Sequence, residues 1–517
     1  MDSDNDGVGD LAGITSQLDY LRWLGVDAIW ISPIFPSPMK DFGYDVSDYQ
    51  NIDPLFGNLN DFDELLKAAH ARNLKVILDF VPNHSSDQHP WFLESKSSKN
   101  NPKRDWYIWR DAAADGGPPN NWLSHFGGSG WEYDAHTEQY FYHAFLKEQP
   151  DLNWRNPEVV ETMLNVLRFW LERGVDGFRV DVIWHLIKDA FFENNPINPD
   201  WHEGLPPFQS LIPLKSTDRP EVHDVIAHMR RLFEEYDDRV LIGEIYLPVE
   251  RLVAYYGVDL TGTHLPFNFQ LIYAKWDASH IAQLINEYET ALPEGGWPNW
   301  VLGNHDQHRI ASRIGIEQAR VAAMLLLTLR GTPTMYYGDE ISMRDVPISP
   351  EQVQDPFEKN VPNMGCGRDP ERTPLQWNAE KNAGFTQATP WLPVAEDFQE
   401  INVEAQKVNT QSMLALYRHL IDLRQNEVAL QVGKFELLKA EGDVLAYIRY
   451  SNDKKNTFLI VLNLGHQAHV FQSLPKDLEN ACIVLSTHLD RNKETVKDII
   501  EVRADEGLII KIEKHKK

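Results

Sequence analysis

Gly177-Phe178-Arg179-Val180-Asp181 is a short, mainly apolar run that ends in an acidic residue, and the chain repeats this pattern. Similar runs lie at 26–32, 75–80, 240–244, 300–304 and 334–337. Amphipathic stretches separate them at 61–72, 159–172, 221–235 and 317–329, each long enough to be a crossover helix. This alternation predicts an α/β fold of parallel strands covered by helices. The number of runs favours a (β/α)8 TIM barrel over an open sheet.

Polar residues follow or end several of these runs, namely Ser32, Asp79, Asp181, Glu244, Asn304 and Asp306. Because the carboxyl ends of barrel strands face the active site, we expect the four acids to converge there. Burying several carboxylates together is costly, since like charges oppose ionisation. Glycoside hydrolysis needs such a group, with one neutral carboxyl as proton donor and one carboxylate at the sugar. For a single acid, the alternative is a helix cap or a surface ion pair.

The chain divides into three predicted regions. Residues 1–84 and 150–430 are expected to form the barrel, and 85–149 a subdomain inserted after the third strand that walls the active-site cleft, because that connection is too long for an ordinary loop. Residues 431–517 change to alternating strand patterns and predict a small antiparallel, β-sandwich-like domain. A barrel also needs a strand before residue 2, so we expect its first strand to be missing from this chain.

Composition excludes several classes of protein. The 517 residues carry 77 acidic against 49 basic side chains, a formal charge of −28, which argues against binding to nucleic acid or an anionic membrane surface. Cys366 and Cys482 are too few for a disulfide framework, and their spacing does not fit a zinc site. The apolar windows are too short to span a membrane, and no signal peptide is visible. These features predict a soluble, cytoplasmic protein.

Four segments together resemble the signature regions of the α-amylase superfamily of retaining glycoside hydrolases. They are Asp79-Phe80-Val81-Pro82-Asn83-His84, Gly177-Phe178-Arg179-Val180-Asp181, Gly243-Glu244 and Asn304-His305-Asp306. The stretches 41–49, 149–153 and 368–377 resemble the α-glucosidase and oligo-1,6-glucosidase branch of that superfamily. The resemblance covers nearly all of the chain apart from the first strand and the C-terminal β region.

The resemblance implies a catalytic role for each acid. Asp181 would be the nucleophile, Glu244 the acid that then becomes the base, and Asp306 a stabiliser of the transition state. Arg179 lies two residues before Asp181 on the same strand, so both side chains point to one side, and it can hold Asp181 ionised. Asp79 would orient Arg179 without touching the bond that is cut.

The resemblance also implies a blind pocket for a terminal glucose. The expected sugar-binding residues are Asp41, Tyr44, His84, Arg179, His305 and Arg368, with Arg372 as the alternative to Arg368. Asp41 and the arginine would recognise the 4-OH and 6-OH, and Tyr44 would stack against the sugar ring. The alternatives are a histidine that bonds a loop carbonyl and a tyrosine that only closes the barrel.

Linkage preference is expected to depend on Val182, which follows the nucleophile. In the branch that the chain resembles, valine there accompanies α-1,6 cleavage and threonine accompanies α-1,4 cleavage. The segment 243–251 looks more like broad bacterial α-glucosidases that also handle maltose and sucrose. Sucrose-isomerising relatives carry a charged run between the third and fourth regions, which residues 269–276 lack.

The acidic loop at 2–10 supplies oxygens at every second position and contains glycines that allow a tight wrap, a pattern suited to a hard divalent cation. An EF-hand is rejected because Gly13 stands at the twelfth position instead of a glutamate. The resemblance implies structural Ca²⁺ or Mg²⁺ bound by Asp2, Asp4, Asp6, Asp10 and the Val8 carbonyl. The alternative is a solvated acidic terminus.

These features predict an exo-acting retaining α-glucosidase without a catalytic cofactor. Its expected substrates are maltose, isomaltose, sucrose or short malto- and isomalto-oligosaccharides, and it is expected to be a monomer or homodimer. A transglucosylase or disaccharide-forming enzyme is the main alternative. A non-catalytic, transporter-associated homologue is disfavoured because all three catalytic acids are present, and a chain inactive for want of its first strand is a further alternative.

Overall fold

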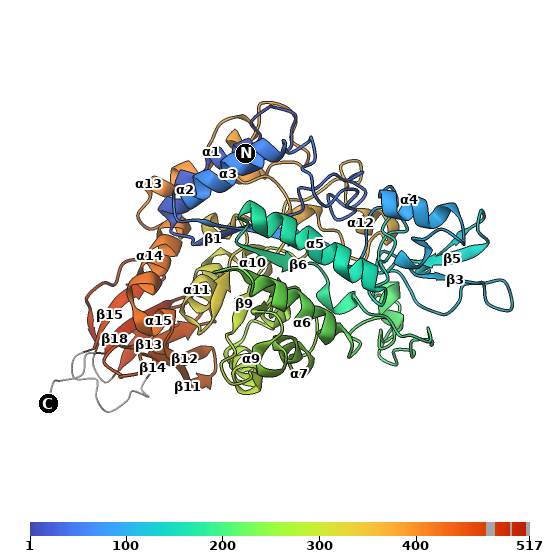
Figure 1. Cartoon of the computed structure of the whole chain (residues 1–517). Helices are drawn as coiled ribbons and strands as arrows, with labels where there is room; N and C mark the ends of the chain where they lie inside the picture. Colours follow the sequence, from blue (N-terminus) through green and yellow to red (C-terminus); the bar gives the residue numbers. More distant parts are fainter. Residues whose placement is uncertain (472–480, 497–498, 513–517) are drawn as a thin grey trace.

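Parallel strands form the centre of the computed structural model, which describes residues 1–471, 481–496 and 499–512. One sheet has the order β1-β2-β6-β7-β8, and a parallel bridge between Asn268 and Trp300 connects it to the pair β9–β10. The seven strands in this part of the chain are β1 (Ala28–Ile31), β2 (Lys75–Phe80), β6 (Gly177–Val180), β7 (Val240–Gly243), β8 (Leu265–Pro266), β9 (Asn299–Val301) and β10 (Thr332–Thr334). Figure 1 shows helices around them.

The strand register brings the acidic strand ends to one rim. Asp79 on β2 lies opposite Arg179 on β6, and the next residue of each strand continues the pairing. The backbone N–H of Asp181 then donates to the carbonyl of Phe80 at 2.8 Å, and that of Glu244 donates to Val180 at 3.0 Å. Two acids that are far apart in the chain therefore leave the sheet at neighbouring places.

The sheet does not close into eight strands within the described residues. No pairing joins β1 to β10 there, and a cavity of about 630 Å³ lies between them, lined by both strands and by helix residues such as Leu24 and Ile421. The described residues thus hold seven strands with an open place between β1 and β10, in keeping with the expectation that the first barrel strand is missing from this chain. β10 begins at Thr332, ahead of the predicted run at 334–337. It includes Pro333, a residue that an edge strand tolerates but that hides the strand in the sequence pattern.

Helices cover the outside of the strands, four of them at the amphipathic stretches predicted at 61–72, 159–172, 221–235 and 317–329. They are α3 (Leu59–His70), α5 (Pro157–Arg173), α6 (Val222–Phe233), α9 (Ala278–Ala291), α11 (Ile316–Thr328) and α14 (Met413–Asn426). Helix α5 shows why such a segment is helical. Asn156 caps its first turn by accepting from the N–H of Glu158, Pro157 occupies its first position, and Gly174 ends it in a left-handed conformation. Its buried face recurs at helical spacing through Met163, Val166, Leu167, Trp170 and Leu171.

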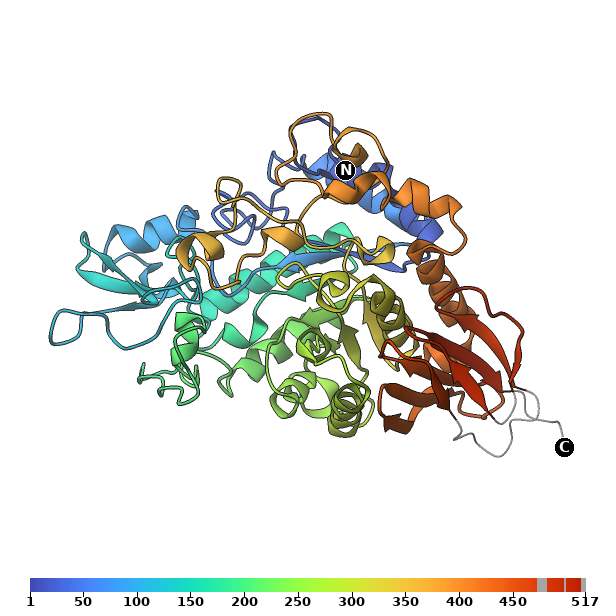
Figure 2. The ribbon, with the colours of Figure 1, turned by 180° about the vertical axis from the view of Figure 1, so that it is seen from behind.

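The region 85–149 contains helix α4 (Pro90–Ser97) and a three-stranded antiparallel sheet of order β3-β5-β4. These strands are β3 (Trp109–Arg110), β4 (Trp131–Asp134) and β5 (Gln139–Tyr142). Aromatic side chains fill its interior, including Trp109, Trp122, Trp131, Phe141 and Tyr142. Figures 1 and 2 show this region at the opposite end of the molecule from the C-terminal sheet.

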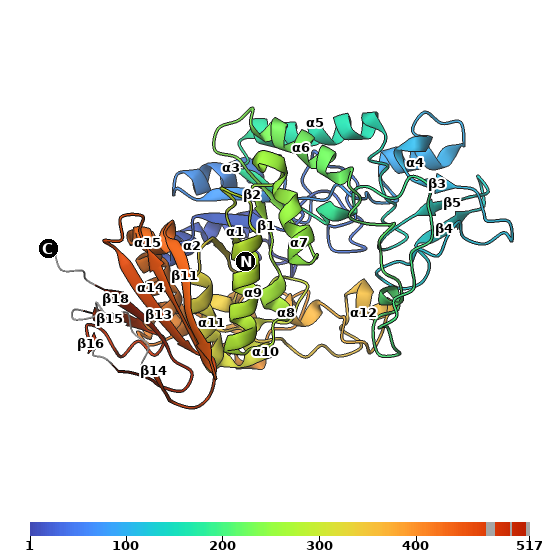
Figure 3. The same ribbon diagram turned by 90° about the horizontal axis from the view of Figure 1, so that it is seen from below.

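The C-terminal region forms a six-stranded sheet of order β11-β12-β13-β18-β15-β16 beside a two-stranded ladder, β14–β17. The strands are β11 (Lys434–Glu441), β12 (Val444–Tyr450), β13 (Thr457–Asn463), β14 (His469–Phe471), β15 (Ala481–Ser486), β16 (Thr495–Val496), β17 (Ile500–Val502) and β18 (Gly507–Ile512). Parts of the predicted domain at 472–480, 497–498 and 513–517 lie outside the described residues. Figure 3 shows the sheet beside α11 and α14.

Two buried arginines bond the end of α11, one from this sheet and one from α14. Arg449 on β12 donates to the carbonyl of Thr328, the last residue of α11, and also to Gly433. Arg424 on α14 donates to the carbonyls of Leu327 and Leu329 at 2.9 and 3.0 Å. The unpaired carbonyls at the end of α11 are thus bonded by side chains from its two neighbours.

The remaining helices are short: α1 (Leu11–Ser16), α2 (Leu18–Leu24), α7 (Val249–Leu252), α8 (Gln270–Tyr273), α10 (Ile310–Ile314), α12 (Pro356–Asn360), α13 (Val403–Val408) and α15 (Val428–Gln431). Across the described part of the chain, none of the helices combines the length and apolarity that crossing a bilayer requires.

Asp176, just before β6, ties together the amino ends of the strands. Its buried carboxylate accepts from the N–H of Val76 at 2.9 Å, from His70 Nε2 at 2.6 Å and from Lys75 Nζ at 3.0 Å. Burial opposes ionisation, but these hydrogen bonds outweigh it and lower the pKa of Asp176.

We expect Asp176→Asn to lower the free energy of unfolding by about 2 kcal/mol at pH 7, because hydrogen bonds to a charged group are lost. The stabilisation by the carboxylate is complete above its unfolded-state pKa of 3.8 and is lost as pH falls through the lower folded-state value. The difference between the variant and the parent should therefore shrink only below about pH 4. Urea unfolding of the variant and the parent, from pH 7 to below about pH 4, measures this difference.

Asp63→Asn is the matched control, because Asp63 forms an exposed ion pair with Arg173 and should cost no more than about 1 kcal/mol. Equal stability of the two variants would contradict the role assigned to Asp176.

Candidate active site

A cavity of about 550 Å³ opens at the carboxyl ends of the strands. Its lining includes most of the predicted catalytic and sugar-binding residues: Asp41, Tyr44, His84, Asp181, Glu244, His305, Asp306 and Arg368. The other two, Arg179 and Arg372, lie behind the acids and contact them from within the protein. Side chains from widely separated parts of the chain therefore meet around one space.

Arg179 is the centre of the buried charge cluster. Its Nη1 donates to Asp79 Oδ1 at 2.9 Å and to Asp181 Oδ1 at 2.8 Å, and its Nη2 lies 2.8 Å from Glu244 Oε2. The guanidinium lies over the ring of Trp30, 4.9 Å from the ring centroid. One positive charge thus faces three carboxyl groups, and this imbalance favours retention of a proton by one of them.

Glu244 is one of the carboxyl groups in this cluster that could keep that proton. Burial raises its pKa, and the charge of Asp306 adds to the effect while Arg179 opposes it. Its Oε2 lies 2.8 Å from Arg179 Nη2 and accepts from the N–H of Val182 at 2.7 Å. No described residue bonds its Oε1, so that oxygen is free to carry the proton. Burial also raises the pKa of Asp181, against the opposing charge of Arg179.

Val182 adopts a strained backbone conformation beside the two acids. Its φ and ψ are 36° and 46°, in the left-handed region that a β-branched residue rarely enters. Such strain costs about 1 to 3 kcal/mol and persists where the surroundings impose it, often at active sites. Here the turn directs the N–H of Val182 at Glu244, so the strained backbone holds the proposed proton donor.

Asp306 is held ionised by two arginines. Arg372 Nη2 lies 2.8 Å and Arg368 Nη1 3.3 Å from its Oδ1. Burial would raise the pKa of Asp306, but His305 and then the two arginines keep it well below the ordinary value. Burial lowers the pKa of the adjacent His305 to about 3, so this imidazole is neutral at physiological pH.

Arg368, and not Arg372, contacts Asp41, with Nη2 2.8 Å from Asp41 Oδ1. Sequence reasoning missed the residue that fixes this arginine. Asp355 is fully buried and accepts from Arg368 at three places, including Nη2 at 2.7 Å and the backbone N–H at 2.7 Å. Asp355 lies in an irregular segment outside every quoted motif, so neither periodicity nor spacing pointed to it.

Tyr44 and His84 connect the pocket wall to the acids. The hydroxyl of Tyr44 donates to Asp79 Oδ2 at 3.0 Å, and its ring stacks on His305 with the centroids 5.6 Å apart. His84 lines the cavity and also lies within hydrogen-bond distance of a loop carbonyl, that of Tyr44, at 3.0 Å. Gln149, quoted only as part of a motif, donates to Asp41 Oδ2 at 3.2 Å and extends this network.

An aromatic wall completes the cavity and was not predicted. It comprises Phe126, Phe145, Tyr246, Phe208 and Phe357, which come from the insertion and from the loops after β6, β7 and β10. Because these loops are irregular, no hydrophobic period marks their residues in the sequence.

The N-terminal loop lies against the segment 385–391 at the edge of the molecule (Figure 2). Carboxylate oxygens of Asp2, Asp4 and Asp10 lie within 4.8 Å of one another, whereas Asp6 is not part of this group. Asp2 accepts from the N–H of Asn5 and Gly7, so the loop wraps around its carboxylate.

Comparison with known proteins identifies relatives over the whole chain. Residues 1–433 match the α-amylase family, described as "Alpha amylase, catalytic domain". An α-glucosidase of Culex pipiens is 41% identical over 90% of this chain and 79% of its own length. The amino acid transporter heavy chain SLC3A1 of Rattus norvegicus is 36% identical, covering 98% of this chain and 76% of its own.

Solved structures show the same fold. The α-glucosyl transfer enzyme XgtA superposes with a TM-score of 0.93 at 36% identity, covering 99% of this chain and 96% of its own. Isomaltulose synthase of Erwinia rhapontici NX5, solved as a mutant in complex with its natural substrate sucrose, gives a TM-score of 0.90 at 34% identity over 99% and 96% of the two chains. These matches confirm the family resemblance found in the sequence.

Proposed function

The chain belongs to the α-amylase family, and from this we propose that it is an exo-acting retaining α-glucosidase. It would hydrolyse terminal α-1,4 or α-1,6 bonds of disaccharides and short oligosaccharides. The observation that carries the proposal is the buried Arg179, which holds Asp181 and Glu244 at 2.8 Å each on the wall of one cavity.

The proposed reaction is a double displacement. Asp181 attacks the anomeric carbon while Glu244 gives its proton to the departing glycosidic oxygen, which breaks the C–O bond and leaves a glucosyl ester on Asp181. Glu244, now ionised, takes a proton from a water that attacks the same carbon. The ester then breaks, and glucose leaves with its original configuration. This mechanism requires carboxyl groups about 5 to 5.5 Å apart.

A terminal sugar fits the polar end of the cavity in this proposal. Asp41 and Arg368 form an ion pair whose remaining lone pairs and N–H groups can bond the sugar hydroxyls. Asp306 stays ionised beside them and supplies negative charge where the oxocarbenium ion develops. The stacked Tyr44 and His305 rings offer an aromatic edge to the sugar.

Transfer of glucose to another sugar is the second candidate, favoured by the similarity to XgtA. The glucosyl ester is common to both reactions, and the ratio of hydrolysis to transfer depends on whether water or a sugar hydroxyl attacks it. The transporter-associated alternative is disfavoured because Asp181, Glu244 and Asp306 all line the cavity.

We also propose a structural Ca²⁺ or Mg²⁺ in the N-terminal loop. Asp2, Asp4 and Asp10 fit a hard cation because they supply carboxylate oxygens at close quarters, and partial desolvation with the charges of Asp6 and Asp10 raises the pKa of Asp4. Asp2, Asp4 and Asp10 do not line the proposed catalytic cavity, so the proposed role of the ion is to stabilise the fold.

We expect Asp181→Asn to lower kcat for maltose and isomaltose by at least about 10⁴-fold while the Tm stays close to that of the parent.

A second experiment adds azide as a nucleophile, with p-nitrophenyl α-glucoside as the substrate, to separate the roles of the two acids. Asp181→Ala should give β-glucosyl azide by one displacement, whereas Glu244→Ala should give the α-anomer through the ester. The same anomer from both variants would contradict the assignment, and Asp63→Asn serves as an active control.

Val182→Thr should shift the ratio of kcat/KM for isomaltose to that for maltose by about tenfold toward maltose, since small pocket changes have effects of this size. A panel of α-1,1, α-1,2, α-1,3, α-1,4 and α-1,6 glucobioses with product analysis measures it and also yields the ratio of glucose to transfer product. Exposed Val258→Thr is the matched control. An unchanged ratio would contradict the role of Val182 in linkage preference.

Calcium added to chelator-treated protein should raise the Tm by at least about 2 °C at saturation. Asp4→Asn should abolish this increase, because it removes one charge from the cluster and Asp4 is exposed enough for the fold to survive. Asp48→Asn, an exposed substitution elsewhere, should leave the response intact. A full response in Asp4→Asn would refute the site.

A further inference from the structure

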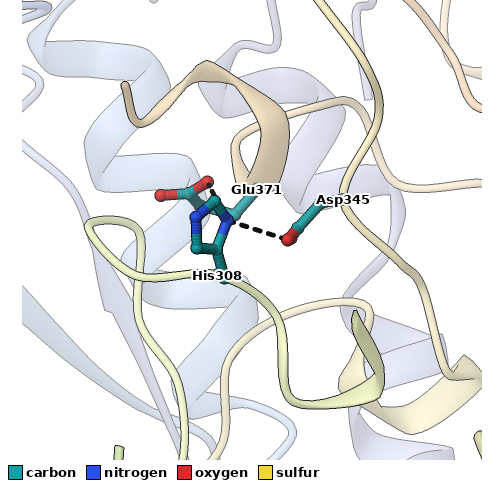
Figure 4. Close-up of side chains that lie close together, drawn as sticks. All are labelled: His308, Asp345 and Glu371. Atoms are coloured by element: carbon teal, nitrogen blue, oxygen red, sulfur yellow. Dashed lines mark ion pairs between the residues drawn. The ribbon is translucent and has the colours of Figure 1, made fainter. Parts of the chain in front are cut away.

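His308, Asp345 and Glu371 converge on one point although they come from three separate segments (Figure 4). His308 lies between β9 and α10, Asp345 follows the turn Asp339–Ile341, and Glu371 ends the turn Asp369–Glu371. His308 Nδ1 is 2.9 Å from Asp345 Oδ2 and 3.9 Å from Glu371 Oε2. One ring nitrogen therefore faces two carboxylates.

Glu371 is the unusual member of this group. Its side chain is 1% exposed, and its Oε2 has no hydrogen-bond partner among the described residues. Burial raises the pKa of Glu371 to about 8. An unsatisfied buried acceptor costs about 1 to 3 kcal/mol, more when it is charged. This buried, unpartnered oxygen lies 3.9 Å from His308 Nδ1, so a cation between the two atoms would satisfy it.

The other His, Asp and Glu group, His488 with Asp490 and Glu506, does not share this property. Arg503 already pairs with Asp490 and with Glu506, each at 2.6 Å. Its carboxylates therefore have positive partners without a metal. The orphaned oxygen distinguishes the group at Glu371.

Ligand type and spacing both suit a transition metal. Zn²⁺ binds imidazole nitrogen and carboxylate oxygen at about 2.0 to 2.2 Å, which places neighbouring ligand atoms of a tetrahedral site about 3.3 Å apart. The observed 2.9 and 3.9 Å lie on either side of that value. A hard cation such as Ca²⁺ would prefer oxygen ligands alone.

The surroundings hold Asp345 in place. Its Oδ1 accepts from the N–H of Arg309 at 2.8 Å, and its own N–H donates to Ser312 Oγ at 2.7 Å. Second contacts of this kind orient ligands in metal sites. His308 is half exposed, so its ring can turn slightly to meet the geometry that the metal requires.

We propose that His308 Nδ1, Asp345 Oδ2 and Glu371 Oε2 bind a divalent transition metal of the Zn²⁺ type. Binding displaces the imidazole proton, which leaves for solvent. Three protein ligands leave a fourth position for water or another ligand. Because His308 and Glu371 also line the catalytic cavity, that position lies beside the space where a sugar would sit. The proposal does not depend on which sugar is bound.

Titration calorimetry of the metal-stripped full chain with ZnCl₂ tests the site. We expect His308→Ala to weaken Zn²⁺ binding at this site by at least about tenfold. The loss of a residue that only orients a ligand already lowers metal affinity by that factor. His466→Ala is the matched control, because His466 is 75% exposed and pairs with Asp505 at 2.8 Å in the same way but is not part of such a group. It should bind as the parent does.

Cobalt supplies a second measurement that does not depend on activity. Co²⁺ in the parent should give a visible d–d spectrum typical of a nitrogen and oxygen site, and His308→Ala and Glu371→Gln should each lose it while circular dichroism stays unchanged. Equal Zn²⁺ affinity in the parent and His308→Ala, or the absence of any Zn²⁺ binding by the parent, would overturn the proposal. If Glu371→Gln fails to fold, the calorimetry and the cobalt spectrum of His308→Ala still test the proposal.

Discussion

The ion cluster around Arg179 is the constraint on which the site depends. One fully buried guanidinium faces Asp79, Asp181 and Glu244, and its charge offsets only part of theirs. Breaking a buried ion pair by removing one partner typically costs about 3 to 5 kcal/mol, because the other charge is left uncompensated. The cluster is tolerable only where the surrounding strands fix it, and its surplus of negative charge favours protonation of one carboxyl group. The proposed acid and the proposed nucleophile thus share one cation.

Strand register explains why the cluster forms at all. Asp79 and Arg179 lie side by side on β2 and β6, and Asp181 and Glu244 follow where β6 and β7 end. A shift of one residue in either strand would turn these side chains to the other face of the sheet. The helices that hold the register, such as α5 with its capped first turn and glycine end, therefore support the chemistry without touching it.

Much of this arrangement could be predicted from the sequence because it follows periodic patterns. The strands at 75–80 and 177–180 and the helix at 157–173 fall where the apolar runs place them. Strand β8 has only two residues and carries no such pattern, and β10 lies ahead of its predicted run because it includes Pro333, a residue that ordinarily argues against a strand. Asp355, which holds Arg368, and Glu371, which faces His308, belong to irregular segments. Their contacts depend on how distant segments pack together, which no local sequence periodicity indicates.

The contact between the C-terminal sheet and the end of α11 has a consequence for how the molecule unfolds. Arg449 and Arg424 bond carbonyls at the very turn that leads into β10. If the C-terminal sheet came away, the carbonyl of Thr328 would lose its bond to the guanidinium of Arg449 inside an apolar interface. The two regions are thus coupled, and a fragment cut near residue 430 would keep every proposed catalytic acid and Arg424 but lose the bond from Arg449 to the end of α11.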